Sequence, residues 1–312
     1  VGTEIKKKAR LVFDGAMQKR LAAANGVNLE TFSPAARHTT LKSFCADTVC
    51  KNHEILKRGS GKTYVLWSAD VTSAYLKGVL PPGERIFARA PEGHRTYDAS
   101  GDELVWELTG PLYGEADAGL LWYNTLVTQL LSQGFSQSDF DPCLFSKEYP
   151  GGGRLDICVY VDDLLARTNV PDVAKSEFDI LHKKFSITFD GQPKMFLGAN
   201  IDVISPTRIS ISNRKYLLGV FEKYMPKSLD KYSEISTPCS QTLKNNYEQA
   251  LKRENKPTQA LLERYMSKVG SLIYAAPSTR VDAAYPIGVC ARVMTFPTPE
   301  MEAEVDRLIV YL

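Results

Sequence analysis

The hydrophobic positions of the chain form short apolar runs, and two of these runs stand on either side of an acidic pair. Residues 155–160 and 164–166 are mostly apolar, and Asp162 and Asp163 lie between them. Two short apolar runs joined by a few polar residues are typical of a β-hairpin. The sequence therefore predicts a hairpin that carries two neighbouring carboxylates at its tip.

Another carboxylate follows an apolar run much earlier in the chain. Residues 64–67 are aromatic or apolar strand formers, and Asp70 ends the stretch. Functional carboxylates are common where core strands give way to loops. Because strands that are distant in sequence can be neighbours in a sheet, we expect Asp70 to lie near the hairpin tip.

The remaining hydrophobic pattern predicts an α+β fold. Helical spacing of apolar residues predicts helices at residues 37–58, 117–133, 171–185, 258–275, 282–294 and 298–312. Further strand-like runs stand at residues 11–12, 86–88, 104–108, 143–145, 186–190, 195–204 and 208–212. The polar stretch at residues 241–257 is expected to be a linker. The order strand, helix, strand, hairpin, helix, strand indicates a split βαβ, ferredoxin-like antiparallel sheet with helices on one face and the carboxylates on the other.

The three acidic residues admit two explanations. Neighbouring carboxylates raise each other's pKa, and burial raises it further, so the pair in the hairpin needs either water or a cation. Exposure of the turn alone would satisfy Asp162 and Asp163. The additional carboxylate of Asp70 favours a metal, because hard oxygen ligands suit Mg²⁺. Two such ions can clamp both oxygens of an in-line phosphoryl displacement.

Composition bounds the class of protein without indicating a partner. The 312 residues are 44% hydrophobic and 24% charged, as in ordinary soluble globular proteins of two or three domains. The net charge of +2 means that any nucleic-acid surface must come from local clustering. Cys143 and Cys158 stand in strand-like runs, which indicates buried thiols in a reducing compartment. No apolar stretch has membrane-spanning length and no signal peptide is visible, so we expect an intracellular protein without a membrane partner.

Eight sequence segments occur in an order that is typical of one family. They are residues 8–12, 30–37, 70–78, 111–123, 134–145, 160–165, 196–198 and 269–274. A single Tyr-Val-Asp-Asp motif at residues 160–163 could arise by chance, whereas eight segments in family order could hardly do so. Together they resemble the reverse transcriptase of copia-type long-terminal-repeat retrotransposon polyproteins.

The resemblance implies an RNA-directed DNA polymerase with a right-hand architecture. Residues 1–60 would be part of the fingers, residues 61–204 the palm with interleaved fingers elements, and residues 205–312 a mostly helical thumb and the start of the connection. The chain begins at Val1 rather than Met and inside a family segment. We therefore expect a fragment without the upstream fingers strands and the downstream ribonuclease H domain. The implied partners are an RNA or DNA template with a primer and deoxynucleoside triphosphates, in a cytoplasmic particle or the nucleus; the oligomeric state stays open.

The resemblance also implies a two-metal site. Asp70 and Asp162 would hold two Mg²⁺ ions, for which Mn²⁺ could substitute. The carbonyl of Val71 would add a ligand, and Asp163 would support the site. One ion would activate the primer 3′-hydroxyl, and the other would neutralise the phosphates. The proton donor to pyrophosphate would be one of three lysines, Lys183, Lys184 or Lys194.

Val71 would also contact the nucleotide, together with four more residues. Arg10 would bind the triphosphate as a bidentate fork, and Tyr75 would be a steric gate against a 2′-hydroxyl rather than a core aromatic residue. Tyr113 and Gly114 belong to a segment that lines the nucleotide pocket in the family. Next to them Asp117 replaces an amide, which puts a negative charge near a polyanion. Either the local geometry differs from the family or activity is weakened.

Two other interpretations stay open. The chain could be a non-catalytic nucleic-acid-binding remnant of a decayed element, since Asp117 departs from the family pattern. It could also be another two-metal enzyme on a ferredoxin-like core, such as a nucleotidyl cyclase, although a cyclase would not explain the segment around Tyr75. A mild basic excess at residues 213–257 fits a thumb on duplex phosphates or a solvated helical face.

Overall fold

The protein divides into two compact units, each with its own core. The computed structural model describes residues 10–253 and 256–312. The sheet unit consists of residues 10–36 and 51–193, and the helical unit consists of residues 37–50, 194–253 and 256–312. The division after residue 193 differs from the expected end of the palm at residue 204. It does not test the assignment to fingers, palm and thumb, which stays a prediction.

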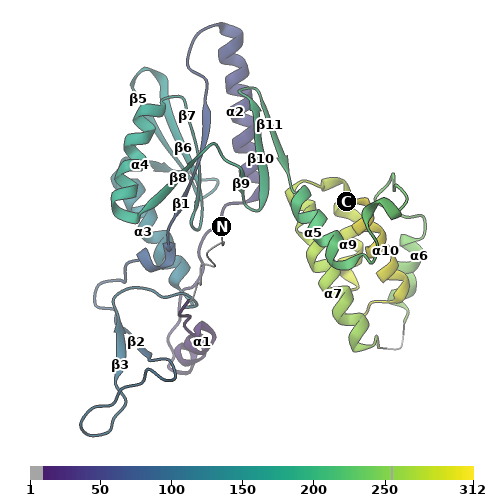
Figure 1. Cartoon of the computed structure of the whole chain (residues 1–312), viewed down its shortest axis with the longest axis horizontal. Helices are drawn as coiled ribbons and strands as arrows, with labels where there is room; N and C mark the ends of the chain where they lie inside the picture. Colours follow the sequence, from purple (N-terminus) through teal and green to yellow (C-terminus); the bar gives the residue numbers. More distant parts are fainter. Residues whose placement is uncertain (1–9, 254–255) are drawn as a thin grey trace, which may run out of the picture. The chain divides into compact units, whose positions relative to one another are not determined.

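A six-stranded antiparallel sheet forms the centre of the sheet unit (Figure 1). Its strands are β1 (Val65–Val71), β4 (Ser136–Gln137), β5 (Leu144–Tyr149), β6 (Gly153–Tyr160), β7 (Asp163–Thr168) and β8 (Ile187–Gly191). They lie in the order β4-β5-β6-β7-β1-β8, and all neighbours are antiparallel. β6 and β7 are buried along most of their length, which explains why they read as continuous apolar runs.

Two helices cover one face of this sheet (Figure 1). Helix α3 (Ala118–Ser132) lies in the chain between β1 and β6, and helix α4 (Pro171–Phe185) joins β7 to β8. Strand β7 lies between β1 and β6 in the sheet, so the unit β1-α3-β6 is split. The prediction of a mixed α+β fold with an antiparallel sheet is confirmed.

The ring contacts of β1 show which way its side chains face. Trp67 packs edge-on against Phe189, and Phe189 packs against Phe178 of α4, so Trp67 lies on the helix side of the sheet. Successive residues of a strand alternate between its two faces. Asp70, three residues after Trp67, is therefore on the face away from α4, as the sequence predicted.

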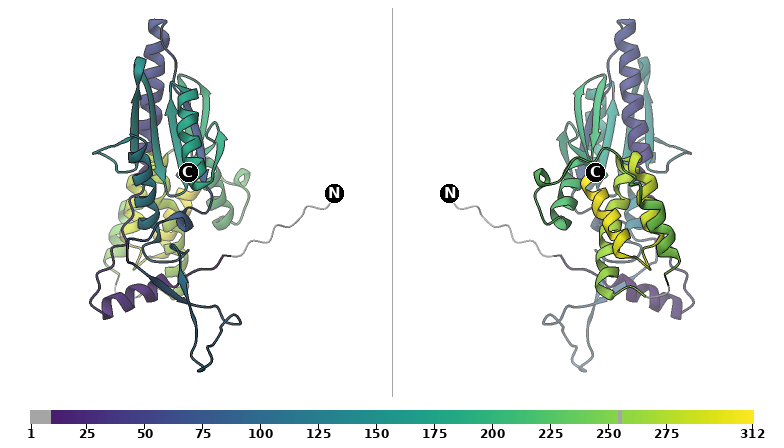
Figure 2. Two further views of the ribbon diagram at one scale, coloured as in Figure 1. Left: turned by 90° about the vertical axis from the view of Figure 1, so that its left-hand side faces the viewer. Right: turned by 90° about the vertical axis from the view of Figure 1, so that its right-hand side faces the viewer.

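Two elements of the sheet unit lie outside the six-stranded sheet. The hairpin of β2 (Ile86–Arg89) and β3 (Val105–Leu108) extends away from it in all views (Figures 1 and 2). Helix α1 (Gly15–Ala24) was not predicted, because none of its residues is buried and its sequence has no apolar stripe. The Asp14 carboxylate caps α1 by accepting from the backbone N–H of Met17 at 3.0 Å.

The predicted strand at residues 11–12 is wrong. Leu11 and Val12 lie in an irregular, exposed segment, and among the described strands none pairs with them. Two apolar residues are too few to bury a strand face. The basic residues at positions 5–9 lie outside the described residues.

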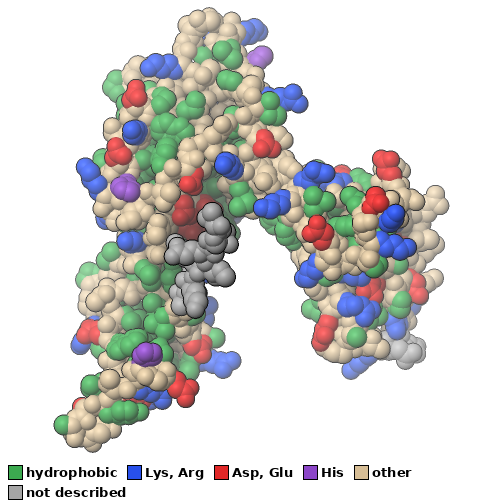
Figure 3. All heavy atoms as spheres, in the orientation of Figure 1, with side chains coloured by type: hydrophobic (Ala, Val, Ile, Leu, Met, Phe, Trp, Pro, Cys, Tyr) green, Lys and Arg blue, Asp and Glu red, His purple; other side chains and the backbone are tan. Residues whose placement is uncertain are grey.

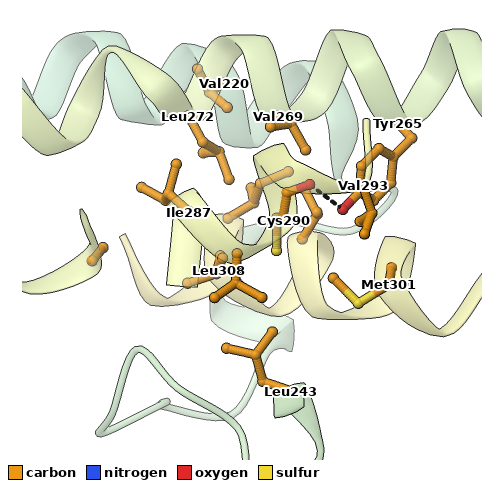
Figure 4. Close-up of a cluster of buried hydrophobic side chains, with 14 of the residues drawn as sticks. Val220, Leu243, Tyr265, Val269, Leu272, Ile287, Cys290, Val293, Met301 and Leu308 are labelled. Atoms are coloured by element: carbon orange, nitrogen blue, oxygen red, sulfur yellow. Dashed lines mark hydrogen bonds between the residues drawn. The ribbon is translucent and has the colours of Figure 1, made fainter. Parts of the chain in front are cut away.

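Helices make up most of the helical unit. They are the first part of α2 (His38–Arg58), α5 (Arg214–Tyr224), α6 (Leu243–Leu251), α7 (Gln259–Ile273), α8 (Ala275–Ser278), α9 (Ala284–Arg292) and α10 (Pro299–Tyr311). A three-stranded antiparallel sheet precedes α5 and consists of β9 (Met195–Phe196), β10 (Ala199–Ser205) and β11 (Arg208–Ser212). Buried apolar side chains from five of the helices form the core, in which the Tyr265 hydroxyl donates to the Cys290 carbonyl at 2.8 Å (Figure 4).

The polar stretch at residues 241–257, predicted to be a linker, instead contains α6. Leu243 at the start of α6 is buried in the core. The buried carboxylate of Glu304 in α10 accepts hydrogen bonds at 2.8 Å from the Thr242 hydroxyl and the Asn246 side-chain amide. A carboxylate near the N-terminus of a helix stabilises it. Because Glu304 is distant in sequence, polar composition alone did not reveal the helix.

The predicted strand at residues 195–204 is two strands joined by a tight turn. Leu197 and Gly198 in this turn have positive φ angles of 53° and 72°. A Cβ on Gly198 would lie 2.7 Å from the Tyr274 hydroxyl oxygen, and that hydroxyl donates to the Leu197 carbonyl at 2.7 Å. A side chain from the end of α7 therefore divides the run.

Three features that the composition suggested can be compared with the structure: the state of the cysteines, membrane-spanning helices and the distribution of charge. All six cysteines lie in the described part of the chain and are free, and Cys143 and Cys158 are buried as predicted. Among the described residues, none of the helices combines the length and apolar character that crossing a membrane requires. On the face shown in Figure 3, Lys, Arg, Asp and Glu side chains are interspersed over the helical unit.

Candidate active site

The predicted hairpin is formed by β6 and β7, and its tip has two residues. Tyr160 and Asp163 are the last paired residues, so Val161 and Asp162 make the turn. The φ angle of Val161 is +56°. A positive φ is uncommon for any residue other than glycine and is a genuine outlier for a β-branched one. Such strain costs roughly 1–3 kcal/mol and persists only where surrounding structure holds it.

Both carbonyl groups of the tip are held by hydrogen bonds from other elements. The indole N–H of Trp122 in α3 donates to the Val161 carbonyl at 2.7 Å. The backbone N–H of Val71 at the end of β1 donates to the Asp162 carbonyl at 2.9 Å. These two bonds fix the tip against α3 on one side and β1 on the other.

This arrangement brings the three predicted carboxylates together. Asp70 of β1 lies directly opposite Asp163 of β7, and carboxylate oxygens of Asp70, Asp162 and Asp163 lie within 4.8 Å of one another. Asp162 is exposed, and the other two are half-buried. Strand pairing thus brings Asp70 next to Asp163, although the two residues are far apart in the sequence.

Burial and mutual repulsion perturb these groups. The pKa of Asp163 is raised from its ordinary value of 3.8 to about 6, mainly by burial and then by the charges of Asp162 and Asp70. Burial, followed by the Asp162 charge, also raises the pKa of Asp70. A divalent cation would offset this repulsion, and three carboxylates with water suit Mg²⁺ or Mn²⁺. The donor set therefore fits the predicted metal site better than a turn that is merely exposed.

A fourth carboxylate, Asp190, was not identified from the sequence. In the pairing of β8 with β1, Ala69 lies opposite Phe189 and Ser68 lies opposite Gly191, so Asp190 is the extra residue of a β-bulge. Its charge contributes to the raised pKa of both Asp70 and Asp163. Bulges re-aim side chains next to active sites. The sequence contains no signal for it, because a bulge depends on the register of two strands.

A pocket of about 780 Å³ lies beside the carboxylates. Its lining comes from residues 10–11, 70–76, 112–113 and 160–162. The pocket therefore unites Asp70, Val71 and Asp162 with three of the other four predicted nucleotide contacts, Arg10, Tyr75 and Tyr113. Its volume is in the range of small-molecule sites.

Aromatic contacts order the wall of the pocket. The guanidinium of Arg10 lies 5.6 Å from the centre of the Tyr113 ring, a cation–π distance. The rings of Tyr113 and Tyr75 meet edge-on at 5.9 Å. Burial and the Asp162 charge raise the pKa of Tyr75, so its hydroxyl stays neutral. Tyr113 thus contacts both Arg10, which is predicted to bind the triphosphate, and Tyr75, which is predicted to be the steric gate.

Gly114, the remaining predicted nucleotide contact, is not part of the described lining. Its φ is +84°, and a Cβ there would lie 2.3 Å from the Phe13 carbonyl oxygen. The Phe13 N–H donates to the Tyr113 carbonyl at 2.6 Å. The absence of a side chain at Gly114 therefore lets the segment that carries Arg10 pack against Tyr113.

Asp117 also lies outside the described lining of the pocket. Its side chain is only 5% exposed and accepts a hydrogen bond of 3.4 Å from the Gln18 side-chain amide of α1. Gln18 in turn accepts from the Ala116 N–H at 2.8 Å. The charge that departs from the family pattern thus contacts α1, which was not predicted. Whether the local geometry differs from the family or activity is weakened stays a prediction.

Among the three candidate lysines, Lys184 donates to Gln129 of α3 at 2.7 Å, on the helix side of the sheet. The residue of β8 that pairs with Asp70 is Thr188. The choice among Lys183, Lys184 and Lys194 as a proton donor stays a prediction.

Comparisons with known proteins agree with the geometry of the site. The sequence profile of the family described as reverse transcriptase (RNA-dependent DNA polymerase) matches residues 2–239. The chain is 29% identical over 311 residues to the retrovirus-related Pol polyprotein from transposon TNT 1-94 of Nicotiana tabacum, which covers 99% of this chain and 22% of the relative. It is 28% identical over 306 residues to the polyprotein from transposon RE1 of Arabidopsis thaliana, covering 98% and 19%. The chain thus spans about a fifth of the length of these relatives.

The solved structures add only a distant likeness. The telomerase of Candida tropicalis in complex with a TWJ fragment of telomeric RNA matches 89% of this chain and 44% of that chain at 10% identity. Its TM-score of 0.35 is too low to establish a common fold. The sequence profile, in contrast, covers most of the 312 residues. The chain therefore belongs to the reverse transcriptase (RNA-dependent DNA polymerase) family.

Proposed function

We propose that this chain catalyses RNA-directed DNA synthesis by two-metal nucleotidyl transfer, as a domain of a copia-type retrotransposon polyprotein. The observation that carries the proposal is the convergence of Asp70, Asp162 and Asp163. Asp70 and Asp162 also line the pocket that contains Arg10 and Tyr75. Family membership favours this function over a nucleotidyl cyclase. In this proposal the six-stranded sheet is the ferredoxin-like palm, with partial fingers before it and a helical thumb and connection after it.

The carboxylates would hold two Mg²⁺ ions, with Val71 offering its carbonyl. When bound, the ions supply activation of the primer 3′-hydroxyl and neutralisation of the phosphate charge. Asp70 on β1 and Asp162 on the tip approach from different strands, so both can be ligands without moving the backbone. Asp163 supports them from its paired position opposite Asp70.

The pocket residues would bind and select the nucleotide. Arg10 offers two parallel N–H donors to the triphosphate, and the Tyr113 ring limits where its guanidinium can lie. The ring of Tyr75 meets the Tyr113 ring edge-on. It would exclude a ribonucleotide by colliding with its 2′-hydroxyl. Holding the reacting groups in this way is the main contribution of a protein to phosphoryl transfer.

The implied substrates are an RNA or DNA template with a primer and deoxynucleoside triphosphates. The basic excess at residues 213–257 would bind duplex phosphates, so binding would weaken as salt rises. The element would be copied inside the cell, in a cytoplasmic particle or the nucleus.

Primer extension on an RNA template tests the proposal. We expect weak Mg²⁺-dependent extension by the unaltered chain and a loss of more than about 100-fold in Asp162→Asn, because an amide cannot supply the charge that the metal site needs. Asp163→Asn should lose less. Asp139→Asn, an exposed residue in the loop before β5, is the matched control and should extend normally. A chain that binds primer–template but never extends it would instead be the non-catalytic remnant.

A further inference from the structure

We infer that Trp122 is a positioning residue whose indole N–H holds the strained hairpin tip in the conformation that brings Asp162 to Asp70. The inference rests on the proposed two-metal function. The inference goes beyond that function, because it names a residue that would contact neither the nucleotide nor the metal and would still determine whether the metal site is formed.

The tip needs an external partner because its backbone is unfavourable. Four residues other than glycine have positive φ in the described chain, and Val161 is the β-branched one among them. A β-branched side chain is the least tolerant of this region of backbone space. A rotation about the N–Cα bond of Val161 would relieve the strain, and it would carry the Val161 carbonyl away from its present direction. A hydrogen bond to the Val161 carbonyl oxygen can therefore hold the backbone in its positive-φ conformation.

The Trp122 side chain provides this hydrogen bond from a fixed position. Its side chain is 1% exposed, and its ring packs edge-on against Phe185 of α4 at 5.1 Å. The 2.7 Å hydrogen bond to the Val161 carbonyl is the polar contact of an otherwise apolar ring. A donor on a fully packed side chain cannot follow a moving acceptor, so the bond holds the tip in one conformation.

Helix α3, which carries Trp122, is itself fixed to the segment that follows Asp70. The Val79 N–H donates to the Thr125 hydroxyl at 2.9 Å. A Cβ on Gly78 would lie 3.1 Å from the backbone nitrogen of Trp122, so this glycine allows close approach of the two segments. The position of the indole relative to Asp70 is thus set by contacts outside the hairpin.

The Val71 N–H provides the second attachment of the tip, at the Asp162 carbonyl. Without the indole bond, the tip keeps this attachment and the ladder between β6 and β7, so the hairpin as a whole stays folded. What is lost is the orientation of the Val161 peptide, and with it the position of the Asp162 carboxylate. The expected defect is therefore in metal affinity rather than in folding.

The competing explanation is that Trp122 is only a large core residue. Both explanations predict some loss when the ring is reduced, but they differ at Val161. If the indole holds a strained backbone, replacing Val161 with glycine should make the indole bond less important, because glycine adopts positive φ without a steric penalty. If the ring only fills space, the change at the tip should not matter.

The test is a double-mutant cycle with Mn²⁺ binding, measured by electron paramagnetic resonance, as the readout. The proteins are the unaltered chain, Trp122→Phe, Val161→Gly and the combination of both; Asp162→Asn identifies binding at the carboxylates. We expect Trp122→Phe to weaken Mn²⁺ binding by about 10–100-fold, as loss of a group that orients a metal ligand does. In the Val161→Gly background the same change should cost less than about threefold.

A control variant and an isosteric replacement separate the bond from packing. Trp67→Phe is matched, since Trp67 packs edge-on against Phe189 at the same 5.1 Å but pairs with Ala166, away from the tip. It should leave Mn²⁺ binding unchanged. Replacement of Trp122 with benzothienylalanine keeps the shape of the ring and removes the N–H, so it should weaken Mn²⁺ binding as much as Trp122→Phe does. This protein keeps the test valid if the smaller phenylalanine ring of Trp122→Phe impairs folding.

Each outcome decides for or against the inference. An equal loss in both Val161 backgrounds, or normal Mn²⁺ binding by the benzothienylalanine protein, would overturn it while leaving the two-metal function intact. Absence of Mn²⁺ binding in the unaltered chain would overturn the proposed function itself, and the role of Trp122 with it.

Discussion

The hairpin tip and the core of the helical unit are held together in opposite ways. At the tip, three carboxylates converge, a β-branched residue has positive φ, and two hydrogen bonds from other elements maintain the shape. In the helical unit, buried apolar side chains from five helices fill the core, and the buried Tyr265 hydroxyl has a partner (Figure 4). The first region contains repulsion and strain, whereas the described core of the second is a cluster of buried hydrophobic residues.

The difference shows where stability and activity are in conflict. Apolar burial stabilises a fold in proportion to the area removed from water. Repelling carboxylates destabilise it, and groups whose pKa is perturbed in this way cluster at functional sites. Removing a charged group from the tip should therefore stabilise the protein and inactivate it, whereas removing apolar volume from the helical core should destabilise it.

The largest contrast is expected from Asp70→Asn. The change removes one of three converging charges, so extension should fall more than about 100-fold. The midpoint of thermal unfolding should stay the same or rise, because the pKa of Asp70 is raised by burial and by Asp162 and Asp190 in the folded chain. Extension assays and thermal melts of the same preparation measure both. A clear drop in the melting temperature would mean that Asp70 stabilises the fold.

In the helical core, Leu308→Ala should have the reverse effect. Leu308 is buried, and a cavity at such a site costs about 2–5 kcal/mol in the free energy of unfolding. All three tryptophans lie in the sheet unit, so their fluorescence reports that unit, while circular dichroism at 222 nm reports mainly helices. We expect the dichroism transition to shift more than the fluorescence transition. Leu251→Ala, at an exposed site, is the control; a similar shift in both proteins would contradict the assignment of the core.

At the pocket wall, Tyr75→Ala should alter selectivity more than stability. If the ring excludes a 2′-hydroxyl, discrimination between a deoxynucleotide and its ribonucleotide should fall by about 10–100-fold. Tyr75→Phe keeps the ring and should keep the discrimination. The ratio of kcat/KM for the two substrates measures the effect, and an unchanged ratio in Tyr75→Ala would make Tyr75 an ordinary packing residue.

The smallest effect is expected from pH in metal-free protein. Because the pKa of Asp163 is raised from 3.8 to about 6, the folded state binds more protons than the unfolded state within that range. The free energy of unfolding should therefore fall as pH rises from about 4 to about 6. The slope should be shallow, since Asp163 is only half-buried, and Asp163→Asn or added Mg²⁺ should reduce it further. Thermal melts at several pH values would reveal a slope of the opposite sign if Asp163 were instead stabilised by its neighbours.

Much of the candidate site could be predicted from the sequence, because its chemistry depends on local patterns. The apolar runs around Asp162 and Asp163 are long enough to define a hairpin, and the run before Asp70 is long enough to define a strand. Where the apolar signal was absent or too short, prediction failed: α1 buries none of its residues, and the run at residues 11–12 pairs with no described strand. The helix α6 was missed because Glu304, which binds polar groups at its start, is distant in sequence.

The sequence by itself determined the longer strands of the six-stranded sheet, the two helices that cover it and the identity of the three carboxylates, since hydrophobic periodicity and residue type are local properties. Only the tertiary structure decided which groups meet. The register of β1 against β7 puts Asp70 opposite Asp163, a bulge in β8 adds Asp190, and Gln18 of α1 donates a hydrogen bond to Asp117. The indole of Trp122 reaches Val161 across 39 residues of sequence. Such contacts depend on register, strain and packing between distant segments, for which a single sequence carries no local pattern.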